Sequence, residues 1–120
     1  MPDNEIVLYG IPNCDQVRKA RAWLADHAIA YRFHDFKKSG VDTRLVSEWQ
    51  DAIGWEQLLN RKGTTWRGLP DQDRAAVTDA ASAAAMMSLH PTLIKRPVLR
   101  LPDRLHAGFS STDYQNIFKV

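Results

Sequence analysis

The sequence of 120 residues is poor in cysteine and has no pair of histidines at metal-ligand spacing. Its only cysteine is Cys14, which excludes an internal disulfide framework and suits a reducing compartment. A metal site needs ligands that converge, and the histidines are scattered over different predicted elements. They are His27, His34, His90 and His106. We therefore expect no metal site.

Long hydrophobic runs and an excess of one charge are also missing. No apolar run approaches the length that spans a bilayer, and the polar, acidic start at residues 1–5 is unlike a secretory signal. The net charge is only +2, with 16 basic and 14 acidic residues interspersed, so no basic surface for nucleic acid is indicated. We expect a cytoplasmic monomer without membrane or nucleic-acid partners, forming one domain over residues 1–120.

The single cysteine lies where a predicted strand gives way to a predicted helix. Residues 5–9 are mostly apolar and rich in strand formers, and Gly10, Pro12 and Asn13 then favour a tight turn. After Cys14, apolar residues recur at helical spacing. They are Val17, Ala20, Leu24 and Ala28. Cys14 is thus predicted at the start of an amphipathic helix.

This location predicts a reactive thiol. A helix start presents unpaired backbone N–H groups and a partial positive charge, and both favour the thiolate, which is the nucleophilic form. Arg18 would add positive potential, while Asp15 would work against it. The alternative is that Cys14 is a small buried apolar residue, as many free cysteines are. A packing role needs neither the strand–turn–helix junction nor the adjacent charge, so we interpret Cys14 as functional.

The rest of the chain predicts more strands around a helical middle. Residues 30–36 form a second strand, parallel to the first because a helix connects them, and 37–40 form a polar turn. In the middle, Asp42 is a helix N-cap and Gly54 the stop of that helix. A short piece at 55–59, a basic loop at 60–67 and a long alanine-rich helix from 70 to 87 follow.

The last third predicts an antiparallel hairpin of strands at 98–101 and 104–108, followed by a helix over 113–118. The order is β-α-β, a helical insertion, then β-β-α. Four motifs within this order resemble the arsenate reductase (ArsC/Spx) family. They are YGIPNCD at 9–15 with RKA at 18–20, LLNRKGTTWR at 58–67, HPTLIKRPV at 90–98 and GFS at 108–110. The resemblance is to the family's YffB-like branch and covers nearly the whole chain.

The resemblance implies a thioredoxin-like (glutaredoxin-like) α/β fold, a mixed four-stranded sheet with a helical insertion at about 41–95. It also implies that Cys14 attacks a small oxyanion such as arsenate, or a disulfide, and that glutathione, with glutaredoxin, resolves the adduct. Glutathione is then a co-substrate, and no cofactor stays bound.

The same resemblance implies a set of binding residues. Arg96 matches a family arginine that holds the oxyanion, and Arg61 or Lys62 falls where another such arginine lies. Pro97 resembles the cis-proline that faces the active cysteine in thioredoxin folds. We also expect Asn13 to contact the anion or glutathione.

Two departures from the family pattern leave the function open. Residues 106–110 carry no match for a third family arginine, which weakens the case for arsenate because planar guanidinium groups suit tetrahedral oxyanions. Val17 occupies the place of the second cysteine of the Spx branch, so no internal disulfide switch forms and an external thiol must resolve the adduct. The alternatives are an Spx-like regulatory module that contacts RNA polymerase without turnover, and a catalytically silent relative.

Overall fold

The computed structural model describes residues 5–120 and divides them into two compact units. One unit contains the described residues up to Asp35 together with Arg96–Val120, and the other is Phe36–Lys95. The predicted insertion at about 41–95 falls inside the second unit. That the whole chain is one domain stays a prediction.

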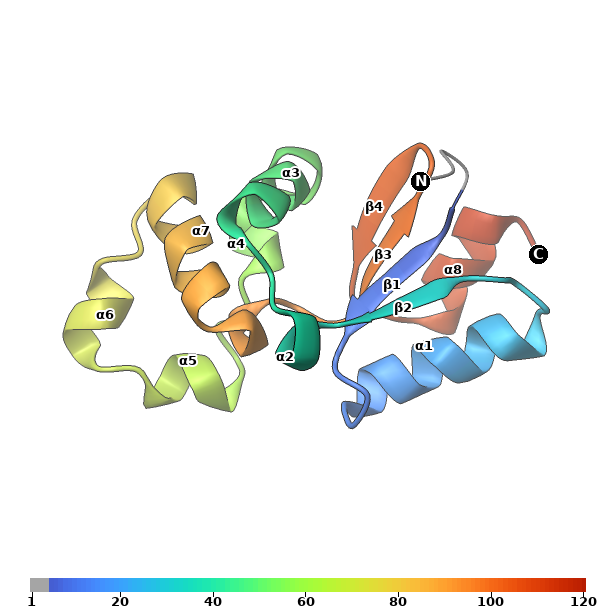
Figure 1. Cartoon of the computed structure of the whole chain (residues 1–120), viewed down its shortest axis with the longest axis horizontal. Helices are drawn as coiled ribbons and strands as arrows, with labels where there is room; N and C mark the ends of the chain where they lie inside the picture. The colour runs from blue at the N-terminus through green and yellow to red at the C-terminus, as the bar shows by residue number, and fades with distance from the viewer. Residues whose placement is uncertain (1–4) are drawn as a thin grey trace. The chain divides into compact units, whose positions relative to one another are not determined.

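The first unit is built on a four-stranded sheet in the order β2-β1-β3-β4 (Figure 1). The strands are β1 (Val7–Gly10), β2 (Arg32–Asp35), β3 (Val98–Leu101) and β4 (Arg104–Ala107). Strands β1 and β2 are parallel, while β1–β3 and β3–β4 are antiparallel. The predicted parallel β-α-β unit and the antiparallel hairpin are both confirmed, and this mixed sheet with its helices is a thioredoxin-like fold.

Two helices cover one face of this sheet, α1 (Asp15–Asp26) and α8 (Ser111–Phe118). Their apolar residues share one core cluster with the sheet. Its buried members are Leu8, Ala20, Trp23, Leu24, Leu99 and Tyr114. This contact explains the helical spacing of Val17, Ala20 and Leu24, because the buried residues of α1 fall on the side that faces the strands. Ala28, predicted to continue the pattern, instead lies beyond the end of α1 and is exposed.

Tyr114 lies at the centre of this core, and its hydroxyl finds no hydrogen-bond partner within residues 5–120. Burial raises the pKa of Tyr114 above its ordinary value of 10.0. Above pH 10 the unfolded chain therefore ionises this phenol while the folded chain keeps it neutral. The contribution of Tyr114 to folding stability therefore falls as the pH rises above 10.

We expect Tyr114→Phe to remove most of that alkaline fall and to be neutral or stabilising by up to about 1 kcal/mol at pH 7, since an unsatisfied buried hydroxyl is lost. Urea unfolding at pH 7, 9.5 and 10.5 measures both effects. Tyr31→Phe is the matched control, because the Tyr31 hydroxyl accepts a hydrogen bond from Arg21 Nε at 3.0 Å. An equal alkaline slope in wild type and Tyr114→Phe would contradict the prediction.

The second unit is helical. Its elements are α2 (Phe36–Ser39), α3 (Thr43–Ile53), α4 (Trp55–Leu58), α5 (Thr64–Gly68), α6 (Asp71–Ala75), α7 (Ala80–Leu89) and a 3₁₀ turn at Pro91–Leu93. The predicted cap is confirmed, since the Asp42 carboxylate accepts from Leu45 N–H at 2.8 Å. Gly54 ends α3 with φ +96°. An antiparallel bridge joins Leu59, just after α4, to Ile94, just after the 3₁₀ turn.

Three predictions for this middle segment are wrong. The 37–40 turn is largely the short helix α2, and the 60–67 loop contains the start of α5. The long helix from 70 to 87 is instead two helices, α6 and α7. The break occurs because Asp79 adopts an extended backbone and caps α7 through a reciprocal pair of bonds with Ser82. A continuous helix would have to give up this cap.

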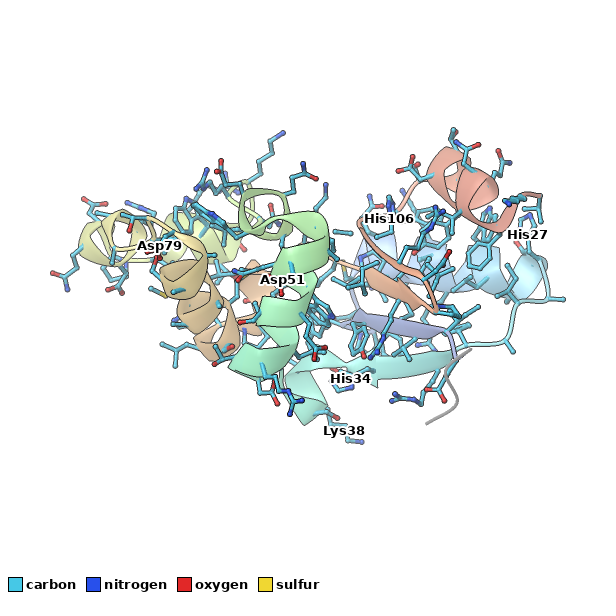
Figure 2. The ribbon with its side chains drawn as sticks, turned by 90° about the horizontal axis from the view of Figure 1, so that it is seen from above. His27, His34, Lys38, Asp51, Asp79 and His106 are labelled. Carbon is cyan, nitrogen blue, oxygen red and sulfur yellow. The ribbon has the colours of Figure 1, made fainter. Side chains whose placement is uncertain are left out.

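The Asp79 cap, labelled in Figure 2, makes the stability of the second unit depend on pH. The Ser82 backbone N–H and hydroxyl donate to the Asp79 carboxylate and lower its pKa below 3.8. A lowered folded-state pKa contributes stability that is present above the unfolded pKa and lost as pH falls. We expect Asp79→Ala to lower Tm at pH 7 and to do so less at pH 3. Circular dichroism melts test this, and an equal loss at both pH values would contradict it.

Candidate functional site

The predicted active cysteine and the Arg96–Pro97 pair lie at the same end of the sheet of the first unit. The register of β1 with β3 pairs Tyr9 with Val98, so the residue after Tyr9 and the residue before Val98 are neighbours across the ladder. The loop carrying Cys14 leaves β1 at this point, and Arg96–Pro97 enters β3 there. The Arg96–Pro97 peptide bond is cis, as the resemblance implied. The Pro97 carbonyl accepts from Gly108 N–H at 2.8 Å.

The Cys14 backbone is well anchored, whereas its thiol is free. Cys14 is the N-cap of α1, with an extended backbone at φ −85° and ψ 132°. Its N–H donates to the Ile11 carbonyl at 3.1 Å, and its carbonyl accepts from Arg18 N–H at 2.9 Å. The side chain is half-buried and makes no hydrogen bond with the described part of the chain. The thiol is therefore accessible and not engaged in capping its helix.

Gly10, predicted to begin the turn after the first strand, is instead the last residue of β1, and it has a packing role. A Cβ at this position would lie 2.7 Å from Val17 Cγ2, and Val17 is fully buried. The absence of a side chain lets the end of β1 approach α1 closely. Gly10 thereby sets where α1 begins relative to the strand, and with it the place of Cys14.

Arg96 and Asn13 belong to the same unit as Cys14. Arg96 is half-buried, and its guanidinium makes no hydrogen bond or ion pair with residues 5–120. All its donors are thus available to an anion. Asn13 is exposed, and its backbone carbonyl accepts from Arg18 Nη2 at 2.9 Å. The structure therefore groups these residues with Cys14 and Pro97 in one unit.

Arg61 and Lys62 belong to the second unit. The Arg61 guanidinium lies over two indole rings, 5.4 Å from the Trp55 centroid and 5.8 Å from that of Trp66. Lys62 is exposed, and its backbone N–H donates to the Asn60 side chain at 3.2 Å. Sequence spacing held no signal for this stacking, because Trp55, Arg61 and Trp66 come from different elements.

Other candidate sites are not supported by the described residues. Within residues 5–120, no group of three or more His, Cys, Asp or Glu side chains is placed to hold a metal ion. None of the helices in that range is both long and apolar enough to cross a membrane. His27, labelled in Figure 2, closes α1: its Nδ1 donates to the Trp23 carbonyl at 2.8 Å, and its ring stacks on Trp23 with centroids 3.8 Å apart.

The structure combines a thioredoxin-like sheet with a cysteine at the start of the first helix. The chain belongs to the ArsC family, whose model matches residues 9–117. It is 44% identical to a protein of solved structure named YFFB, over 92% of this chain and 96% of that one, with a TM-score of 0.88.

Two further relatives show the range of the family. The chain is 46% identical to an arsenate reductase (ArsC) related protein from Brucella melitensis, over 97% of this chain and 96% of that one, with a TM-score of 0.75. It is also 27% identical to the global transcriptional regulator Spx of Streptococcus agalactiae, over 90% of this chain and 79% of the relative. The YffB-like and arsenate reductase resemblance is thus confirmed, and a regulator is among the relatives.

Proposed function

We propose that this protein is a glutathione-linked thiol reductase in which Cys14 is the nucleophile. One observation carries the proposal: the Cys14 thiol is half-exposed and unbonded at the start of α1, in a chain with no second cysteine. Membership of the ArsC family and the relatives with arsenate reductase in their names support it. We place the protein in the cytoplasm, where glutathione is abundant and keeps thiols reduced.

The proposed cycle for a disulfide substrate balances with two glutathione molecules. The Cys14 thiolate attacks one substrate sulfur, forms a mixed disulfide and expels the other sulfur as a thiolate. A glutathione thiolate then attacks the Cys14 sulfur and releases the second half of the substrate. A second glutathione thiolate attacks the glutathione sulfur of that adduct, which frees the Cys14 thiolate and leaves glutathione disulfide. Two electrons pass from two glutathione thiols to the substrate.

Anion binding is assigned to the basic residues named above. Arg96 has its donors free and belongs to the same unit as Cys14, so we propose that it holds a glutathione carboxylate or an oxyanion. Arg61 or Lys62 would supply a second positive group. In this proposal Pro97 shapes the surface on which glutathione or the substrate docks, and Asn13 adds a polar contact. Glutaredoxin is the proposed protein partner, acting on the glutathione adduct.

An Spx-like regulatory role is the second candidate, because a transcriptional regulator matches 90% of this chain. On this view the protein contacts RNA polymerase and performs no turnover. The two candidates differ in what Cys14 must do. A reductase needs its thiol in every cycle, whereas a binding module without a second cysteine does not.

The test is glutathione-dependent reduction of a small disulfide and of arsenate, followed by NADPH oxidation with glutathione reductase. The proposal predicts turnover of at least one of the two substrates that rises with glutathione concentration. The absence of turnover, together with stoichiometric capture of RNA polymerase subunits that persists in Cys14→Ser, would overturn it in favour of the regulator.

A further inference from the structure

The guanidinium of Arg18 donates hydrogen bonds to both residues that flank Cys14. Nη2 donates to the backbone carbonyl of Asn13 at 2.9 Å, and Nη1 donates to Asp15 Oδ1 at 3.2 Å. The first bond reaches back into the turn before the cysteine, and the second lies within the first turn of α1. One planar group therefore joins the two segments that meet at Cys14.

These side-chain bonds complete a set that fixes the backbone around the thiol. The Cys14 N–H is held by Ile11, and the Cys14 carbonyl is held by the Arg18 N–H. Among the polar groups of Cys14, the sulfur makes no hydrogen bond with the described part of the chain. We propose that Arg18 is a positioning residue, which holds the turn at 11–14 against α1 so that the thiol keeps one direction. The inference rests on the proposed role of Cys14 as a nucleophile.

We expect Arg18 to affect Cys14 through the geometry of its hydrogen bonds, and not through its charge alone. A guanidinium is a rigid fork whose separate N–H groups reach two acceptors in different directions, whereas an ammonium is a compact charge on a flexible stem. Asp15 also places a negative charge beside Cys14, which by charge alone would disfavour the thiolate. The positioning role and the charge effect therefore predict opposite results when Asp15 is removed.

Lys19 provides the matched control. It is the next residue on α1, carries the same charge, is exposed, and takes part in no hydrogen bond or ion pair within residues 5–120. Removing the Lys19 charge changes the local field without touching the turn. Arg18 itself is 61% exposed and Asp15 83%, so variants at these positions leave the core intact.

The experiment is the rate constant for alkylation of Cys14 by iodoacetamide at pH 7, measured on the full chain. We expect Arg18→Gln and Arg18→Lys both to slow the reaction about three- to tenfold, a rise of about 0.7–1.4 kcal/mol in the activation free energy. Asp15→Ala should also slow it, while Lys19→Gln should leave it unchanged. A wild-type rate in Arg18→Lys, or a faster reaction in Asp15→Ala, would overturn the proposal in favour of charge alone.

Melting temperatures keep this test separate from folding, because slowing with an unchanged Tm reports on the thiol and not on unfolding. The test is also separate from the proposed function. Iodoacetamide needs no glutathione, so a protein that never turns over can still show the Arg18 effect. Conversely, turnover in the wild type with equal alkylation rates in every variant would uphold the reductase and overturn the positioning role.

Discussion

Cys14→Ser is expected to abolish glutathione-dependent turnover and at the same time to stabilise the protein. Cys14 occupies the N-cap of α1 with an extended backbone, but its side chain makes no capping hydrogen bond. Serine is among the preferred N-cap residues because its hydroxyl accepts from a free N–H of the first turn. We expect a gain of about 0.5–1 kcal/mol in the free energy of unfolding. The hydroxyl cannot replace the thiolate as nucleophile, so no turnover should remain.

Cys14→Ala separates the two effects. Alanine removes the thiol without offering a cap, so this variant should also be inactive while gaining none of the stability of Cys14→Ser. Urea unfolding and the coupled NADPH assay measure the two properties on the same samples. Residual turnover in both variants would show that Cys14 is not the nucleophile. Equal stability of the serine and alanine variants would show that the position does not act as a cap.

Gly10→Ala is expected to lower the free energy of unfolding by about 1–3 kcal/mol, the usual range for overpacking a core. The new Cβ would lie 2.7 Å from Val17 Cγ2 and 3.2 Å from Cγ1. Val17 is fully buried and branched at Cβ, so its side chain has little freedom to turn away. The strand end and α1 must therefore move apart, which should also slow alkylation of Cys14.

A second substitution tests this cause. Val17→Ala removes both of the methyl groups that the new Cβ meets, so Gly10→Ala should cost less in a Val17→Ala background than in wild type. Gly68→Ala is the matched control, since its Cβ would meet nothing within 4 Å, and we expect a change of at most about 1 kcal/mol. Additive losses in the Gly10–Val17 double variant would contradict the packing explanation.

Much of the fold was predictable from local patterns. The strand–turn–helix around Cys14, the caps at Asp42 and Gly54 and the hairpin after Pro97 each rest on residues close together in the chain. Short-range rules of periodicity and turn chemistry suffice for such elements. The prediction of one long helix for the alanine-rich segment was wrong because its composition favours helix throughout. The Asp79–Ser82 cap instead decides where α7 begins.

The place of the candidate site was predictable, whereas its detailed contacts were less so. The junction predicted Cys14 at the start of α1, and the family resemblance predicted the cis bond before Pro97. The two hydrogen bonds of the Arg18 guanidinium could not be predicted. The sequence shows a positive charge one turn from the thiol, but it does not show where the N–H groups of that side chain point. The stacking of Arg61 on two tryptophans is equally hidden, since it depends on how separate helices pack.

The glutathione-linked cycle of Cys14 is tested most directly by intact-mass analysis of the purified chain after incubation with glutathione disulfide, with peptide mapping of any adduct. A reductase with Cys14 as its nucleophile should carry a single glutathione adduct on Cys14, removed by reduced glutathione and absent from Cys14→Ser. A chain that stays unmodified while its Cys14 still reacts with iodoacetamide would contradict glutathione as the co-substrate, and with it the proposed reductase.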